Sequence, residues 1–97
     1  MVRFVVLLQF TQQGVGQVEN SPARGEIFRQ HVADAGGNVE FLFWTLGSVD
    51  GVLVLSAPDE ETAVSLVLGL RQLGNVQTTM LRAYDAEEFA AIAAKIP

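Results

Sequence analysis

His31 is the only histidine of the chain, and it lies in a segment with helical spacing, one turn after Phe28 and two turns after Arg24. Side chains at these spacings share one face of a helix. Because an imidazole changes its charge near neutral pH, His31 could act as a general base. No nucleophile lies near it in the sequence, so the competing interpretation is an ordinary histidine at the surface or at the boundary of the core.

Asp50 and Arg82 are charged residues at positions where a ligand could use them. Asp50 lies in an expected hairpin turn, where a carboxylate could orient a ligand, but aspartate also favours turns because it hydrogen-bonds its own backbone. Arg82 lies within an expected strand, on the side that carries Thr78 and Met80. A charge there must be paired or exposed. It could bind an anionic ligand, or it could pair with Asp50 or with a carboxylate across an interface.

Trp44 and Tyr84, in two different expected strands, could line an aromatic pocket. Large aromatic side chains in strands more often belong to a core or to an interface. Both interpretations stay open on the sequence.

Two familiar site patterns are not met. Gly14 and Gly16 follow the first expected strand, but the dinucleotide fingerprint requires a third glycine that opens a helix in a parallel sheet. Glu26, His31 and Asp34 do not have the spacing of a metal-binding triad on a helix. The chain has no cysteine, which excludes disulfides, thiolate metal sites and thiol catalysis. The sequence therefore implies no metal and no cofactor.

Alternating strands and helices must position these residues. Segments rich in β-branched and aromatic residues predict four strands, at Val2–Phe10, Val39–Leu46, Val52–Ala57 and Val76–Tyr84. Helical spacing predicts three helices, from Ser21 to Ala35, from Asp59 to Leu73, and a short last one from Asp85. Ser21 and Asp59 are expected N-caps, and Asp85 with Glu88 has the capping-box spacing. Residues 11–20 have no period and are expected to form a loop.

A repeated tripeptide supports this order of elements. Gly37-Asn38-Val39 and Gly74-Asn75-Val76 each end a helix and begin a strand. Two strand–helix–strand halves predict an α+β fold of the ferredoxin-like βαββαβ type, with a four-stranded antiparallel sheet and a C-terminal helix. The whole chain, residues 1–97, is expected to be one domain.

The expected strands are apolar on both faces, unlike an antiparallel sheet that has one wet side. The period of two assigns residues to opposite faces as follows: Phe4, Val6, Leu8 and Phe10 against Val5 and Leu7; Val39, Phe41 and Phe43 against Leu42, Trp44 and Leu46; Leu53 and Leu55 against Val52 and Val54. Two helices cover only one face, so we expect a second copy to cover the other, in a homodimer or in a higher oligomer built from it. The alternative is a monomer with a few exposed aliphatic side chains.

Composition narrows the class of partner. The net charge is −5, with only six Lys and Arg residues spread along the chain, which speaks against nucleic acid and against an anionic membrane surface. The apolar run from Phe4 to Leu8 is too short to span a bilayer or to form a signal peptide. We therefore expect a cytoplasmic protein that binds no membrane.

Several motifs, in this order and at this spacing, resemble the GYD domain family, a group of small bacterial and archaeal proteins. They are Thr11-Gln-Gln-Gly14, Ser21-Pro22-Ala-Arg24, Gly36-Gly37, Trp44-Thr45-Leu46-Gly47, Ala57-Pro58-Asp59, Leu73-Gly74-Asn75-Val76 and Thr79-Met-Leu81-Arg82-Ala83. The turn that gives the family its name reads Gly47-Ser48-Val49-Asp50 here, with Val49 in place of the tyrosine. The resemblance implies a ferredoxin-like fold akin to the dimeric α/β-barrel proteins, and no established activity.

Two hypotheses on function follow. The first is a small-molecule binding protein, with a cleft between the sheet and the helices of an oligomer, near the first loop, first helix and second strand. The residues to test in it are Thr11, Arg24, His31, Trp44, Asp50 and Arg82. The second is a non-catalytic assembly or regulatory module without a ligand pocket. The sequence identifies no reaction.

Overall fold

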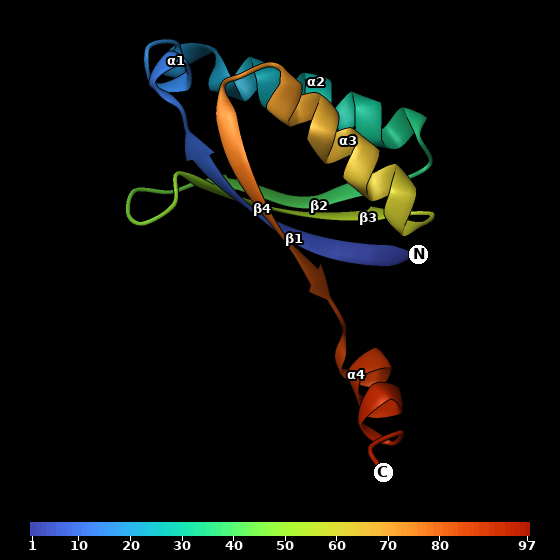
Figure 1. The fold of residues 1–97 in the computed structure, drawn as a ribbon. Coiled ribbons are helices and arrows are strands. Elements are labelled where there is room, and N and C mark those ends of the chain that lie inside the picture. Colours follow the sequence, from blue (N-terminus) through green and yellow to red (C-terminus); the bar gives the residue numbers. More distant parts are fainter.

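Four strands form one antiparallel sheet in the order β2-β3-β1-β4 in the computed structural model, which describes residues 1–97. The strands are β1 (Val2–Phe10), β2 (Asn38–Trp44), β3 (Gly51–Ala57) and β4 (Val76–Ala83). Helices α2 (Ser21–Asp34) and α3 (Glu60–Gln72) lie side by side on one face of the sheet (Figure 1). The predicted α+β fold with a ferredoxin-like order of elements is confirmed.

The core lies between the sheet and these two helices. Its fully or nearly fully buried apolar residues come from β1, β2, β3, α2 and α3: Phe4, Val6, Phe28, Val32, Val39, Leu53, Leu55, Ala57, Ala63 and Val67. The alternation predicted for β1 and β3 is confirmed for the apolar residues that the sequence assigned to the core side, since Phe4 and Val6 are buried in β1 and Leu53 and Leu55 in β3. Asp59 caps α3 as predicted, with its side chain accepting a hydrogen bond from the Thr62 backbone N–H.

The segment expected to be an irregular loop is largely helical. It contains α1 (Gln12–Val15) and a 3₁₀ turn (Val18–Asn20) that runs directly into α2. Asn20, rather than Ser21, therefore occupies the N-cap position, and the predicted capping role of Ser21 is wrong. Its hydroxyl instead accepts a hydrogen bond from the indole Nε1 of Trp44 at 2.9 Å.

β2 does not follow the simple alternation. A bulge lies between Val39, which pairs with Leu55, and Phe41, which pairs with Val54. The extra residue, Glu40, shifts the phase of the strand, so Val39 is buried against the helices while Phe41 is exposed. The prediction that these two side chains share a face is wrong for this reason.

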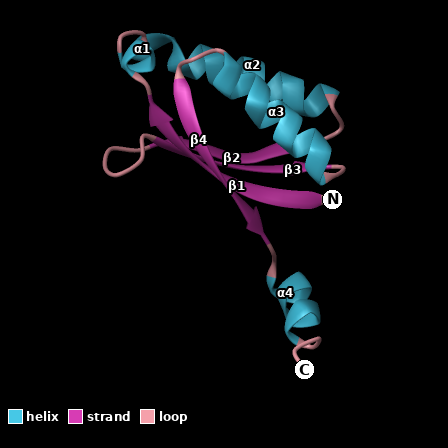
Figure 2. Cartoon of the chain, in the orientation of Figure 1, coloured by secondary structure: helices cyan, strands magenta, loops and turns pink.

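Helix α4 (Ala86–Ala93) stands away from the rest of the chain, beyond the end of β4 (Figures 1 and 2). Both hydrogen bonds of the predicted capping box between Asp85 and Glu88 are present. None of its residues is buried. No helix in the chain combines the length and the apolar character needed to cross a bilayer.

Candidate functional site

An apolar cleft opens between the sheet and helices α2 and α3, at the end of the sheet where β1 finishes and β4 begins. Its apolar walls include Leu8, Phe28, Leu42, Leu53, Leu70 and Val76. The volume is about 50 Å³, and one water molecule needs about 10–15 Å³ on this scale. The cleft therefore admits a group of a few heavy atoms rather than a large cofactor.

Gly25 keeps this cleft open. It lies in the middle of α2, and a Cβ atom added there would be 3.0 Å from Leu42 Cδ2 and 3.4 Å from Trp44 Cη2. A glycine in a helix interior is unfavourable by about 1 kcal/mol relative to alanine. The close approach of Leu42 and Trp44 gives the glycine a packing role at this position.

Trp44 forms part of the wall at the end of β2. Because its Nε1–H donates to the Ser21 hydroxyl at 2.9 Å, the indole is held against the first turn of α2. Trp44 is thus a fixed apolar wall whose single donor is already used.

Asp50 also lines the cleft and ties the β2–β3 hairpin to the end of β1. One carboxylate oxygen, Oδ2, accepts the Phe10 backbone N–H at 2.8 Å. The Asp50 backbone N–H donates to the carbonyl of Leu8 at 2.8 Å. The structural role that the sequence left open beside a ligand role is therefore present for one carboxylate oxygen.

Arg24 is the cation of the cleft. It is half-buried, and Nη2 donates one hydrogen bond, to the carbonyl of Gln17 at 3.2 Å. No carboxylate oxygen lies within 4.0 Å of its guanidinium. A guanidinium has five donors, so Arg24 retains donors for an anion.

Thr11 lies next to the cleft but serves the backbone. Its hydroxyl donates to the carbonyl of Gly74 at 2.6 Å and accepts the N–H of Gly14 at 3.1 Å. Its own N–H donates to the carbonyl of Asn75, which lines the cleft. Thr11 therefore fixes the turn before β4 against the start of α1.

His31 lies outside the cleft. It is exposed at a groove between α2 and α3, whose walls also include Ile27, Leu66 and Gly69. Arg24 and Phe28 line both the groove and the cleft, which agrees with the helix face expected for Arg24, Phe28 and His31. The structure brings no nucleophile or carboxylate into hydrogen bonding with His31.

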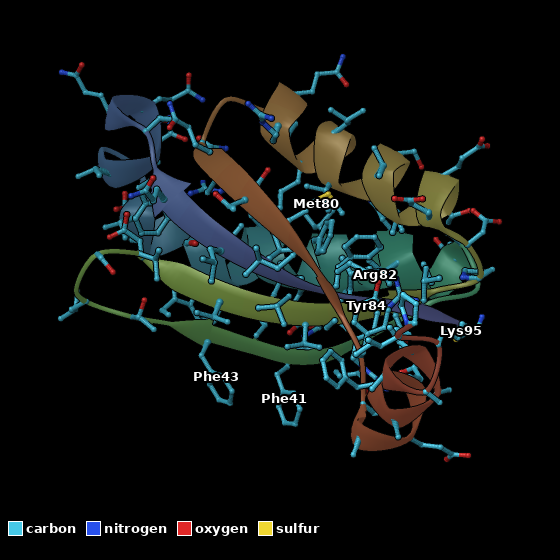
Figure 3. All side chains as sticks on the ribbon, turned by 60° about the horizontal axis from the view of Figure 1, so that its bottom comes forward. Phe41, Phe43, Met80, Arg82, Tyr84 and Lys95 are labelled. Atoms are coloured by element: carbon cyan, nitrogen blue, oxygen red, sulfur yellow. The ribbon has the colours of Figure 1, made fainter.

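Arg82 lies toward the opposite end of the sheet. It is six residues along β4 from Val76, a separation of roughly 20 Å in a strand. The guanidinium donates to the backbone carbonyls of Arg3 and Ala83, and it lies over the Tyr84 ring, 4.5 Å from its centroid (Figure 3). No carboxylate lies within 4.0 Å, so the suggested pairing of Arg82 with Asp50 is wrong.

The cleft thus gathers Arg24, Trp44 and Asp50 from the six predicted site residues. The sequence reasoning did not include the apolar walls or the residues Ser21, Gly25 and Asn75. An isolated glycine within a helical pattern is a signal of close approach, and Gly25 was such a signal. Trp44 and Tyr84, suggested together as an aromatic pocket, lie toward opposite ends of the sheet, Trp44 at the end of β2 and Tyr84 just after β4, and Tyr84 takes no part in the cleft.

The cleft combines an apolar wall with a cation and a carboxylate, groups that suit the recognition of a small ligand. No group of three His, Asp or Glu side chains lies close enough to hold a metal ion.

Comparison with protein families matches residues 4–93 to the GYD domain. No curated protein matches the chain.

Proposed function

The chain belongs to the GYD domain family, and from the geometry of the cleft we propose that it binds a small carboxylate with a short apolar group. The observation that carries this proposal is an unpaired guanidinium, that of Arg24, at an apolar cleft of a few atoms' capacity.

The walls favour an apolar body for the ligand. Binding sites for small molecules are mostly apolar, with a few placed polar groups that fix orientation. Here the floor between Leu8 and Leu53 is aliphatic, and Phe28 and Trp44 add aromatic surface. An aliphatic chain of about three or four carbons matches the volume given above.

The two charges orient the ligand. A guanidinium and a carboxylate make strong, often bidentate hydrogen bonds, so the anionic end of the ligand lies at Arg24. Asp50 repels an anion, and the ligand's carboxylate therefore points away from the β2–β3 turn.

We propose that this site works in a homodimer. The sheet face opposite α2 and α3 carries exposed aromatic and aliphatic side chains, among them Phe41 and Phe43. Soluble monomers seldom expose a large contiguous apolar patch, and a second copy with the same face is the simplest cover.

The alternative function is an assembly or regulatory module that binds no ligand. Its support is that the polar groups around the cleft already have partners within the chain: Thr11 with Gly74, Trp44 with Ser21, and one oxygen of Asp50 with Phe10. Arg24 is the group that separates the two functions, because only ligand binding uses its spare donors.

A screen of short carboxylic acids tests the proposal, with the fluorescence of Trp44, the only tryptophan, as the readout. Binding should change this fluorescence in a saturable way. Gly25→Ala should weaken binding at least roughly tenfold, because the added methyl group enters the cleft between Leu42 and Trp44.

Gly69→Ala is the matched control. It is the same substitution in the interior of the neighbouring helix, and nothing lies within 4 Å of the added Cβ. It should leave binding unchanged. If no acid binds, or if Gly25→Ala binds as well as Gly69→Ala, the cleft is not the site and the assembly module becomes the better account.

A further inference from the structure

The chain exposes more surface than a monomer of its size should. Its accessible area is 6217 Å², whereas a folded monomer of this mass exposes about 5,400 Å². The excess of about 800 Å² equals one partner's share of a standard protein–protein interface. The radius of gyration, 14.5 Å, also exceeds the value of about 12.5 Å expected for this length.

Part of the excess lies on the helix-free face of the sheet, which we call the open face. Its apolar residues, read from the strand register, are Val5, Leu7, Phe41, Phe43, Val52, Val54 and Leu81. Phe41 and Phe43 are 56% and 60% exposed. Both point away from α2 and α3 (Figure 3).

The rest of the excess includes α4. Phe89 and Ile92 are three residues apart, so they share one side of α4, and Ile96 follows just after the helix ends; the three side chains are 60%, 45% and 75% exposed. An isolated helix of eight residues is marginal in water, and helices of this length depend on packing of an apolar side. Within its own chain none of the α4 side chains is buried.

The direction in which α4 leaves the sheet is that of the open face, although the helix lies beyond the end of β4 (Figure 1). It stands on the side of the sheet opposite α2 and α3 (Figure 1). Arg3 connects the first turn of α4 to the sheet, because its guanidinium binds Glu40 of β2 at 2.7 Å and lies 3.8 Å from Glu88 of α4. The hydrogen bond with Glu40 and then the negative charge of Glu40 raise the pKa of Arg3 above its usual value.

We propose that α4 and the residues directly after it form an arm that packs Phe89, Ile92 and Ile96 against a second copy of this chain. The inference rests on the sheet-face dimer proposed above. Packed sheets lie about 10 Å apart, and eight helical residues span about 12 Å. An arm that leaves one sheet toward the other therefore reaches the level of the partner's sheet, and two-fold symmetry repeats the contact.

The neutral character of the open face agrees with a second copy as the occupant. Arg3 and Glu40 are the charged residues that the register and the bulge place there, and they neutralise each other. Because the face carries no net charge, two identical copies of it can meet without electrostatic repulsion.

A pair of substitutions in α4 tests the arm. Phe89→Glu puts a charge on the apolar side, and Ala91→Glu puts the same charge on the opposite side of the same helix. Sedimentation equilibrium of the full chain should give a dimer of twice 10.5 kDa. Phe89→Glu should raise its dissociation constant at least roughly tenfold, and Ala91→Glu should change it less than about twofold.

A second measurement shows where the arm lies. Because the chain has no cysteine, Ala94→Cys carries a single spin label, and this chain is mixed with ¹⁵N-labelled chains that carry no label. If the arm packs on the partner, the spin label should cause paramagnetic relaxation enhancement of amide signals in the ¹⁵N-labelled chain. Circular dichroism confirms that each variant is folded, which is expected since Phe89 is exposed in the isolated chain.

The outcomes separate the proposals. A full chain that sediments as a monomer overturns both the dimer and the arm. A stable dimer in which Phe89→Glu and Ala91→Glu behave alike, with no relaxation enhancement between chains, overturns the arm alone. Carboxylate binding by the cleft is measured independently at Trp44 and decides only the proposed function.

Discussion

The Asp50 carboxylate accepts the backbone N–H of Phe10 at 2.8 Å, and through this bond the β2–β3 hairpin holds the end of β1. Replacing Asp50 by alanine leaves the half-buried Phe10 N–H without its partner. We expect a loss of stability of about 1–3 kcal/mol, measured by urea denaturation.

Ser48→Ala is the control in the same turn. Ser48 takes part through its backbone carbonyl, which accepts from Gln9, so removal of its hydroxyl should leave stability unchanged. If the two substitutions lowered the free energy of unfolding equally, the loss would come from a general change in the turn and not from the Asp50–Phe10 hydrogen bond.

Gly69→Ala should stabilise the chain by about 0.5–1 kcal/mol, because alanine favours the helix and the added methyl group meets nothing within 4 Å. Gly25→Ala should gain less, since its methyl group approaches Leu42 to 3.0 Å. The thermal midpoints of the two variants check this order. A larger gain for Gly25→Ala would contradict the tight approach of Leu42 to α2.

Asp59 gives stability a defined dependence on pH. Hydrogen bonds from Thr62 lower the pKa of this carboxyl below its usual range. The ionised form therefore stabilises the fold fully above the unfolded value of about 3.9, and this contribution is lost as the pH falls through the lower pKa of the folded state.

The test is the difference in stability between the wild type and Asp59→Asn, measured from pH 6 to pH 2. It should be constant at the upper end and shrink below about pH 4. Asp34→Asn is a control, because no backbone N–H at a helix start depends on that residue. A difference that stays constant down to pH 2 would rule out the Asp59 carboxylate as the stabilising form.

The Arg3–Glu40 pair should matter more to the dimer than to the single chain. Exposed ion pairs contribute little to folding, but a partner sheet would bury this pair, and removal of one member would leave an unpaired charge in the interface. Glu40→Ala should therefore weaken dimerisation strongly, and the double replacement Arg3→Leu with Glu40→Leu should restore it. Analytical ultracentrifugation compares the three proteins. Equal dimer stability in Glu40→Ala and the wild type would place the pair outside the interface.

Much of the fold could be predicted because its elements obey simple periods. β1 and β3 pair without a bulge, so the buried sides that carry Phe4 and Leu55 follow directly from the sequence. The prediction for β2 was wrong because nothing in the sequence marks the bulge. Glu40 has the residue type of an ordinary strand position, and only the pairing with β3 shows that it is the extra residue.

The site was harder to predict than the fold. Arg24, Trp44 and Asp50 come together because the first helix, the second strand and the hairpin turn meet at one end of the sheet. Arg82 lies outside the cleft because the length of β4 separates it from that end of the sheet. Its hydrogen-bond partners are backbone carbonyls, which residue types do not predict. The cleft walls were missed because apolar side chains around a cleft look the same in sequence as those of a filled core.

The most direct test of the proposed ligand class compares butyrate with butyramide, two ligands of the same shape that differ in charge. NMR titration at the Trp44 indole N–H gives both dissociation constants for the wild type and for Arg24→Gln. The account predicts that the wild type prefers the acid at least roughly tenfold and that Arg24→Gln loses this preference. Equal affinity of the wild type for the two ligands, or a preference that survives in Arg24→Gln, would contradict it.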